Sequence, residues 1–235
     1  MKILTIIPAR KNSKGIKKKN LSKIRGKPLI YYTFKTCEKI KNVSKFCLTT
    51  DSKEIINYSK KFKKISAPFI RPKKISMDHS KISQVIMHTL KYYRKIGLIF
   101  DYIVLLQPTN PYRSAKEINF VIKDMTSNNF DSGFGVTQSW FHPYEHFYLK
   151  KNKVILNKKF DKNRQLYKNF YFISGAIYIC KTKFFIKKKK LLDKKSKAYL
   201  LSEPSMIDID ETFHLEIAKS INKPDKFKAK YRRLN

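Results

Sequence analysis

The stretch Ile3-Leu4-Thr5-Ile6-Ile7-Pro8-Ala9-Arg10-Lys11-Asn12-Ser13-Lys14-Gly15 decides the fold class of this chain. It opens with a run of apolar or β-branched residues that stops at a proline, a pattern typical of a strand buried on both faces of a parallel sheet. Ligands of open parallel sheets bind beyond the carboxyl ends of the strands. The basic loop that follows this strand is therefore expected to lie where a ligand binds.

Strand-like and helix-like segments alternate through the rest of the chain. Further strands are expected at Lys45–Thr50, Tyr102–Leu106, Asp131–Val136, Tyr171–Cys180 and Ala198–Leu201. Helices are expected at Pro28–Ile40, Ser52–Phe62, Ser80–Ile96, Ser114–Ser127 and Asp210–Ile221, with Ser52, Ser80 and Ser114 as candidate N-caps. The alternation predicts one α/β domain over residues 1–235, with helices covering a mostly parallel central sheet in a three-layer αβα arrangement.

The alternation stops between Ser139 and Asn169, where the sequence is aromatic and basic. A hairpin over Phe147–Leu156 that turns at Lys151-Asn152 is expected there. A segment of this kind inside an α/β domain is more typical of an arm, a lid or a dimer contact than of a second domain. The lysine runs Lys187–Lys190 and Lys194–Lys197 are expected on a surface segment.

The composition is strongly basic, with 53 Lys and Arg against 17 Asp and Glu and a formal net charge of +36. These charges are spread along the chain and most are lysines, whereas base-specific recognition favours arginine forks. A solvated lysine-rich surface that attracts anionic substrates is the simpler interpretation. A non-catalytic protein that binds nucleic acid is the alternative of a different class.

Three scattered cysteines, Cys37, Cys47 and Cys180, form no paired motif and are expected to be buried thiols in a reducing compartment. The first apolar run is shorter than a signal peptide requires. No segment approaches the roughly 18 apolar residues of a membrane span. We therefore expect a cytoplasmic protein without membrane insertion.

The loop after the first strand carries the groups that a polyphosphate requires. A glycine allows close backbone approach, and hydrogen-bond donors and cations surround it. The residues concerned are Arg10, Asn12, Ser13, Lys14, Gly15 and Lys19. The loop matches neither a Walker A motif nor a dinucleotide-binding fingerprint, and a solvated basic loop is an equally good interpretation from the residues alone.

Two further segments have chemistry that suits a site. The loop Gln107–Arg113 leaves a buried strand and carries polar side chains that suit a sugar, although a proline-shaped turn before a helix has the same pattern. Asp208 and Asp210 would face one side of an extended segment and could hold a divalent cation. Alternatively, Asp210 only begins the last helix. Asp51 is expected to serve the start of the next helix, with ligand binding as the alternative.

Taken together, the motifs resemble those of the acylneuraminate cytidylyltransferase family, enzymes that make CMP-activated sialic acids and related nine-carbon sugars. The resemblance spans nearly the whole chain and rests on motifs in the family's order. These are Pro8–Asn20, Thr49–Asp51, Arg71-Pro72, Leu105–Arg113, Ser174–Ile179 and Ile207–Asp210. The opening motif and the glutamine-proline motif are the most specific.

The resemblance implies a nucleotide-diphospho-sugar transferase-like fold, CTP and an acidic sugar as substrates, Mg²⁺ as cofactor, and a homodimer formed through the arm at about 139–169. On this hypothesis the nucleotide-binding residues are Arg10, Asn12, Ser13, Lys14, Gly15, Lys19, Asn20 and Arg71. The sugar side comprises Gln107, Thr109, Arg113, Ser174 and Gly175, while Asp208 and Asp210 hold the metal. Lys19, Arg10 and Asp210 are the expected catalytic residues.

This chain departs from the family pattern at several positions. Asn110 and Tyr112 stand where the family usually has Ser and Leu or Phe, and Ser174 replaces an Asn. Phe172-Ile173 replaces an Arg-Pro pair of some sialic acid enzymes. The loss of that arginine argues against assuming that the substrate is ordinary N-acetylneuraminic acid. Another acidic sugar or a phosphonate, activated by a nucleotidyltransferase of the same fold, is the nearest alternative.

Overall fold

The computed structural model describes residues 1–156, 168–221 and 231–234, and its centre is an 8-stranded sheet with the order β12-β11-β7-β10-β6-β1-β4-β5. Strands β10 and β12 run antiparallel to their neighbours, and the others share one direction. The strand bounds are β1 Ile3–Pro8, β4 Lys45–Thr49, β5 Ile65–Ser66, β6 Tyr102–Leu105, β7 Ser132–Gln138, β10 Tyr171–Lys181, β11 Lys197–Leu200 and β12 Arg232–Leu234. The mostly parallel sheet is as predicted.

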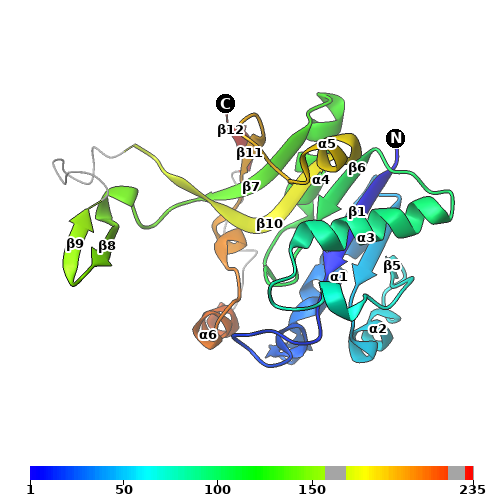
Figure 1. Cartoon of the computed structure of the whole chain (residues 1–235), viewed down its shortest axis with the longest axis horizontal. Coiled ribbons are helices and arrows are strands. Elements are labelled where there is room, and N and C mark those ends of the chain that lie inside the picture. The colour runs from blue at the N-terminus through cyan, green and yellow to red at the C-terminus, as the bar shows by residue number, and fades with distance from the viewer. Residues whose placement is uncertain (157–167, 222–230, 235) are drawn as a thin grey trace.

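Alternate residues of the central strands pack on opposite faces of the sheet. Ile3 and Ile7 of β1 belong to one hydrophobic core, and Leu4 and Ile6 belong to the other. The first core is completed by α1 (Leu29–Lys39), α2 (Lys53–Ser59) and α4 (Ala115–Ser127), and the second by α3 (Ile82–Lys95) and α5 (Thr182–Lys188). Helices thus cover both faces (Figure 1), which confirms the three-layer αβα arrangement.

Local signals set most of the helix boundaries. The Ser52 hydroxyl accepts a hydrogen bond from the Ile55 N–H, and Ser114 caps α4 in the same manner. The prediction that Ser80 caps α3 is wrong, because that helix begins at Ile82 and the Gln84 side chain accepts the Lys81 N–H. Helix α5 and the edge strands β5 and β12 were not predicted. Helix α6 spans Thr212–Ser220, within the expected helix Asp210–Ile221.

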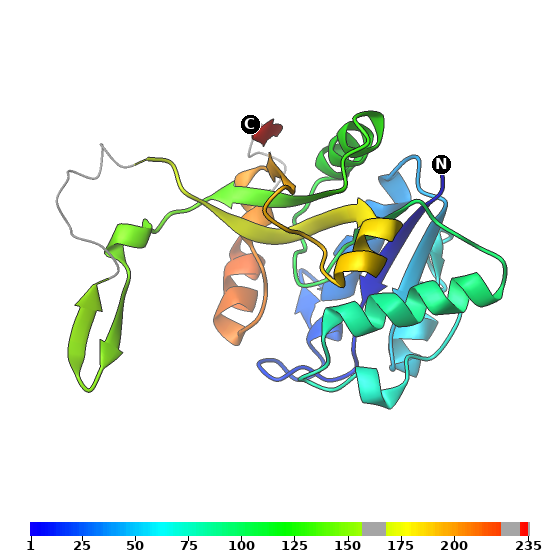
Figure 2. The same cartoon turned by 45° about the horizontal axis from the view of Figure 1, so that its top comes forward.

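The aromatic segment after β7 forms a projecting hairpin of β8 (Phe147–Lys150) and β9 (Lys153–Leu156). Its turn residues Lys151 and Asn152 both have positive φ, of 49° and 59°, as a two-residue type I′ turn requires. Figures 1 and 2 show the hairpin standing away from the sheet, beyond the end of β7. The predicted hairpin is confirmed, whereas residues 157–167 of the predicted arm lie outside the described residues.

Two smaller elements complete the described chain near the first loop. Strands β2 (Lys23–Ile24) and β3 (Lys27–Pro28) form a short hairpin before α1. Ile24 and Leu29 belong to a third small core that also includes Ile209 and Leu215. This core joins the amino-terminal loop region to the segment that precedes α6. Cys37, Cys47 and Cys180 are free and buried, as expected.

Candidate active site

The loop that follows β1 is held by hydrogen bonds to the neighbouring segments. The Ala9 N–H donates to the Thr49 carbonyl at 3.0 Å, and the buried Asn20 side chain donates to the Arg10 carbonyl, also at 3.0 Å. Gly15 packs directly against the segment before α6, because a Cβ there would clash with the Asp210 carbonyl oxygen. The loop is therefore fixed at both ends and closed against a distant part of the chain.

Three cations of this region lie in different environments. The Lys19 ammonium donates to the Ile209 carbonyl and to the Asp210 carboxylate, both at 2.9 Å, and its side chain is only 11% exposed. Arg10 pairs with the exposed Asp78 at 2.5 Å. Arg71 is buried; burial lowers the pKa of its guanidinium, and the nearby Asp51 carboxylate counteracts that shift.

The Gln107–Arg113 loop is held from below by buried polar contacts. The Asn110 amide donates to the carbonyls of Ser174 and Ser205. The Arg113 guanidinium donates to the carbonyls of Gln107, Asn110 and Ala176, and it is 4% exposed. Burial lowers the pKa of Arg113 to about 10. Arg113 therefore shapes the loop from inside the protein rather than facing the solvent.

Asp208 lies where the Gln107 loop meets β10. Gly175, with φ of 73°, brings its backbone close to the carboxylate of Asp208 and to the side-chain oxygen of Gln107. The Thr109 carbonyl accepts the Ile209 N–H at 2.8 Å, which holds the segment of Asp208 against this loop. Burial is the main cause of a raised Asp208 pKa, and the Asp210 charge adds to it.

Two cavities adjoin at this end of the sheet. The first, of about 280 Å³, is lined by Pro8, Arg10, Ser13, Lys19, Asn20, Arg71, Ile75, Ser76, Met77, Asp78, Ser80, Ile82, Val85, Gln107, Pro108 and Thr109. The second, of about 370 Å³, is lined by Ile82, Ser83, Leu105, Gln107, Tyr178, Phe185, Lys189, Lys190, Leu191 and Leu192. The two cavities share Gln107 and Ile82. The first is lined mainly by cationic and polar residues, whereas the second is largely apolar and carries two lysines.

The sequence model of the cytidylyltransferase family matches residues 4–208. The chain belongs to the cytidylyltransferase family. The resemblance inferred from the motifs is thereby confirmed, and the chain is a nucleotidyltransferase.

Two relatives of similar length and one longer relative agree with this membership. A pseudaminic acid cytidylyltransferase from Campylobacter jejuni is 27% identical over 226 residues, covering 95% of this chain and 97% of that protein. A CMP-N,N′-diacetyllegionaminic acid synthase from Legionella pneumophila is 28% identical over 218 residues, covering 89% and 91%. An N-acylneuraminate cytidylyltransferase from Escherichia coli is 28% identical and extends further, since 94% of this chain matches 52% of it.

Solved structures of cytidylyltransferases share the fold. A CMP:2-keto-3-deoxy-manno-octonic acid synthetase complexed with CTP superposes with a TM-score of 0.67 at 14% identity, covering 96% of this chain and 100% of that one. A 4-diphosphocytidyl-2C-methyl-D-erythritol synthase from Anaerococcus prevotii gives a TM-score of 0.63 at 15% identity, covering 93% and 95%. At these identities the likeness establishes the fold.

The structure distributes the residues expected in a cytidylyltransferase site as follows. The first cavity brings together Arg10, Ser13, Lys19, Asn20, Arg71, Gln107 and Thr109. Gly175 and Asp208 adjoin Gln107, and Asp210 adjoins Lys19. Asn12 and Lys14 are exposed on the loop, Gly15 packs on Asp210, and Ser174 and Arg113 are buried beneath the site.

Sequence reasoning missed two parts of the cavity walls. The segment Ile75–Ser80 lines the first cavity, and the Arg71-Pro72 motif just before it was the available signal. Tyr178, Leu191 and Leu192 line the second cavity. Tyr178 lies within the quoted Ser174–Ile179 motif, but Leu191 and Leu192 follow a lysine run without any motif of their own.

The Asp208 and Asp210 pair fits a divalent cation. Asp208 Oδ1 is buried and has no hydrogen-bond partner in the described part of the chain, although a buried carboxylate oxygen ordinarily has one. Within the described residues no three His, Cys, Asp or Glu side chains gather as metal ligands. Two carboxylates completed by water and phosphate oxygens are the ligand set that Mg²⁺ commonly uses.

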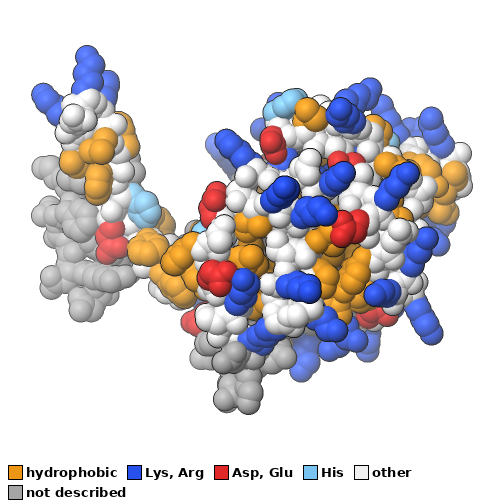
Figure 3. Space-filling view, turned by 90° about the horizontal axis from the view of Figure 1, so that it is seen from below, with side chains coloured by type: hydrophobic (Ala, Val, Ile, Leu, Met, Phe, Trp, Pro, Cys, Tyr) orange, Lys and Arg blue, Asp and Glu red, His pale blue; other side chains and the backbone are white. Residues whose placement is uncertain are grey.

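Lysine and arginine side chains are scattered over the face shown in Figure 3 rather than gathered into one patch. This agrees with the interpretation of the net charge as a solvated surface. Within the described residues, no helix combines the length and the apolar character that crossing a bilayer requires.

Proposed function

We propose that this chain transfers a cytidylyl group from CTP to an acidic sugar, a sialic acid or a related nonulosonic acid, with release of pyrophosphate. One observation carries the proposal: a cation-lined cavity beyond the carboxyl ends of β1 and β6 shares Gln107 with a second, largely apolar cavity. A nucleotide in the first cavity and a sugar in the second would meet beside Gln107 and Asp208.

The first cavity suits the triphosphate and nucleoside of CTP. Arg10 and Lys19 supply charge beside the hydroxyl of Ser13, and the triphosphate would replace Asp78 as the anionic partner of Arg10. Charge-assisted hydrogen bonds of this kind bind phosphates strongly. Arg71 also lines this cavity, bonded to Ser76, and would serve the base or ribose. The exposed Asn12 and Lys14 would contribute from the rim of the loop.

The second cavity suits an acidic sugar that carries an apolar substituent. Leu191, Leu192 and Tyr178 provide apolar walls, and Lys189 and Lys190 can pair with a carboxylate. N-acyl groups and carboxylates are features of sialic and related nonulosonic acids. Gln107, which both cavities share, would mark the boundary with the nucleotide side, with Thr109 and Gly175 beside it. The buried Ser174 and Arg113 would act from beneath, through the backbone contacts that hold this loop.

The reaction joins a sugar hydroxyl oxygen to the α-phosphorus of CTP, breaks the bond from that phosphorus to the bridging oxygen of the β-phosphate, and releases the hydroxyl proton to solvent. Little covalent chemistry is asked of the protein, so positioning and charge neutralisation dominate. Lys19 and Arg10 would stabilise the charge of the departing pyrophosphate. Asp208 and Asp210 would hold Mg²⁺, which when bound neutralises phosphate charge and polarises the α-phosphate.

The arm suggests a homodimer. Phe147, Tyr148, Leu149 and Val154 of the hairpin are each more than half exposed, and Figure 3 shows hydrophobic side chains along the arm and its connection to the body. Exposed apolar groups of this extent are typical of interfaces. We therefore propose that residues 1–235 form one nucleotidyltransferase domain with an inserted dimerisation arm at about 139–169, working in the cytoplasm.

A substrate matrix tests the proposal. The purified protein with Mg²⁺ is given each of CTP, UTP, ATP and GTP together with sialic, legionaminic, pseudaminic or eight-carbon acidic sugars, or a phosphonate, and pyrophosphate is measured. We expect release with CTP and a nonulosonic acid. Release only with an eight-carbon sugar or a phosphonate would favour the alternative of the same fold, and no release with any pair would refute the proposal.

A further inference from the structure

Asp51 occupies a central place at the carboxyl edge of the sheet. It follows β4, which lies between β1 and β5 in the strand order. The segment after β1 carries Arg10 and Lys11, and the segment after β5 carries Arg71. The Arg71 N–H donates to the Thr50 carbonyl at 2.8 Å, so the segment after β5 remains joined to β4 at this level. One side chain at Asp51 can therefore reach both flanking segments.

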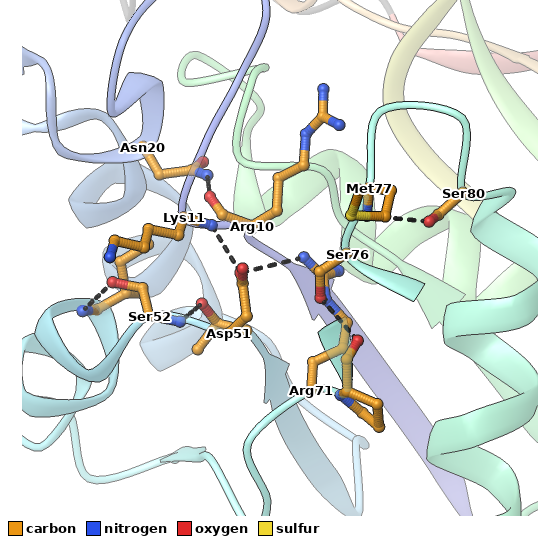
Figure 4. Close-up of polar contacts among 12 residues, drawn as sticks. Arg10, Lys11, Asn20, Asp51, Ser52, Arg71, Ser76, Met77 and Ser80 are labelled. Carbon is orange, nitrogen blue, oxygen red and sulfur yellow. Dashed lines mark hydrogen bonds and ion pairs between the residues drawn. The ribbon is translucent and has the colours of Figure 1, made fainter. Parts of the chain in front are cut away.

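The carboxylate of Asp51 contacts both of them. Its Oδ1 accepts the Lys11 N–H at 2.7 Å and lies 3.7 Å from a terminal nitrogen of Arg71. Figure 4 shows these contacts on either side of Asp51, with the Arg10 side chain directed away from it. Ser52, not Asp51, caps α2. The capping role expected of Asp51 thus belongs to Ser52. The Asp51 carboxylate instead contacts the loop after β1 and Arg71.

A charge at Asp51 matters because Arg71 is buried. The Arg71 side chain is 4% exposed, and a buried guanidinium that lacks a carboxylate partner is strongly disfavoured. Its Nε donates to the Ser76 hydroxyl at 3.0 Å, which ties Arg71 to the segment lining the first cavity. Asp51 itself is not among the residues that line that cavity. Asp51 would therefore act on a nucleotide through Arg71 and through the loop to which Lys11 belongs.

We propose that Asp51 is a positioning residue of the nucleotide half of the site, which fixes the loop after β1 and the Arg71 guanidinium relative to each other. The loop after β1 and Arg71, which both contribute to the lining of the first cavity, are then prearranged for a nucleoside triphosphate before it binds. The inference rests on the proposed function only for the identity of that nucleotide.

Two substitutions separate the contacts of Asp51. Asp51→Asn keeps an oxygen that accepts the Lys11 N–H but removes the charge opposite Arg71, whereas Asp51→Ala removes both. We expect the KM for CTP to rise about tenfold in Asp51→Asn and further in Asp51→Ala, as for the loss of a charged hydrogen-bonding partner. The KM for the sugar should stay near the wild-type value. Equal rises in both KM values would indicate general damage and overturn the inference.

Asp101 supplies a matched control. Its carboxylate accepts the Lys2 N–H at 2.6 Å beside the amino ends of β1 and β6, and Asp101 lines neither cavity. Asp101→Asn should leave both KM values unchanged. In an Arg71→Ala background, Asp51→Asn should raise the KM for CTP less than about twofold, because coupled residues give non-additive effects. Additive effects of the two substitutions would contradict an action of Asp51 through Arg71.

Hydrogen exchange without nucleotide separates this inference from the proposed function. Backbone amides of residues 9–14 should exchange faster in Asp51→Ala than in the wild type or in Asp101→Asn, because the Lys11 N–H loses its acceptor. If Asp51→Ala exchanges faster but the wild type releases no pyrophosphate from CTP, the proposed function is refuted and the positioning role of Asp51 is still supported. Wild-type exchange together with a wild-type KM for CTP would overturn the positioning role.

Discussion

The side-chain nitrogen of Asn110 lies 3.1 Å from the carbonyl oxygen of Ser174 and donates a hydrogen bond to it. The same amide donates to the Ser205 carbonyl at 2.6 Å, and Asn110 is fully buried. These bonds join the Gln107 loop, β10 and the segment leading to Asp208. Asn110 and Ser174 are two of the positions at which the chain departs from the family pattern, and the structure places them in direct contact.

Asn110→Ala should lower the free energy of unfolding by about 1–3 kcal/mol, because two buried carbonyls lose their donor. Chemical denaturation followed by circular dichroism measures this change. Asn119→Ala is the control, since Asn119 also bonds backbone groups, of Lys39 and Lys41, but at exposed positions where water can replace it. If Asn110→Ala lowers the free energy of unfolding no more than Asn119→Ala does, the structural role of the Asn110 amide is contradicted.

Lys19→Ala should reduce turnover about 100-fold or more while leaving the fold intact, by analogy with the removal of one charge-stabilising donor from an active site. Turnover is followed by pyrophosphate release at saturating substrates, and the fold by circular dichroism. Lys17→Ala is the matched control, because Lys17 is an exposed lysine of the same loop that does not line the first cavity. Near-normal turnover in Lys19→Ala would refute the catalytic assignment of Lys19.

Asp208→Asn should make the metal-free protein more stable at pH 7, because burial raises the pKa of Asp208 and its ionised form therefore costs stability in the folded state. A carboxyl group whose pKa is raised in the folded state lowers the free energy of unfolding only when it is ionised. The stability difference between variant and wild type should thus shrink as pH falls through the raised pKa toward the ordinary value of 3.8. Thermal unfolding with a chelator across this pH range measures it.

The same pair of proteins tests the metal assignment. Mg²⁺ should raise the melting temperature of the wild type at pH 7, since a ligand that binds only the folded state stabilises it. It should do so much less in Asp208→Asn and Asp210→Asn. An equal Mg²⁺-dependent shift in the wild type and both variants would place the cation elsewhere.

Leu149→Asp should convert a dimer into a monomer, because it puts a charge on the exposed apolar surface of the hairpin, where Leu149 is 64% exposed. Light scattering after size-exclusion chromatography gives the mass. Ile99→Asp is the control, since Ile99 is 69% exposed but lies in the loop between α3 and β6. A wild-type monomer, or a Leu149→Asp variant that stays dimeric, would argue against the arm as the contact.

Strong local patterns made much of the fold predictable. The apolar run Ile3–Ile7 indicated a central strand, and its alternate residues do pack into two cores. Lys151-Asn152 indicated a hairpin turn, which both residues form with positive φ. Ser80 resembled an N-cap, yet its hydroxyl accepts the Met77 N–H within the preceding turn. Such competition between local hydrogen bonds cannot be decided from residue type alone.

The parts of the site that follow directly from strands could be predicted. The parts that depend on the direction in which a side chain points could not. Arg10 and Gln107 follow β1 and β6, which are adjacent, so their meeting follows from the sheet order. The burial of Arg113 under its own loop depends on acceptors from β10. The edge strand β12 is three residues long, too short for any periodic signal. Tertiary packing, not local sequence, sets these features.

Phosphorus NMR of the reaction mixture can show whether CTP and an acidic sugar form a CMP ester. We expect a new phosphodiester signal from a CMP-sugar that appears in equal amount with pyrophosphate. Pyrophosphate released without that phosphodiester, or inorganic phosphate as the only phosphorus product besides CDP, would contradict the proposed function.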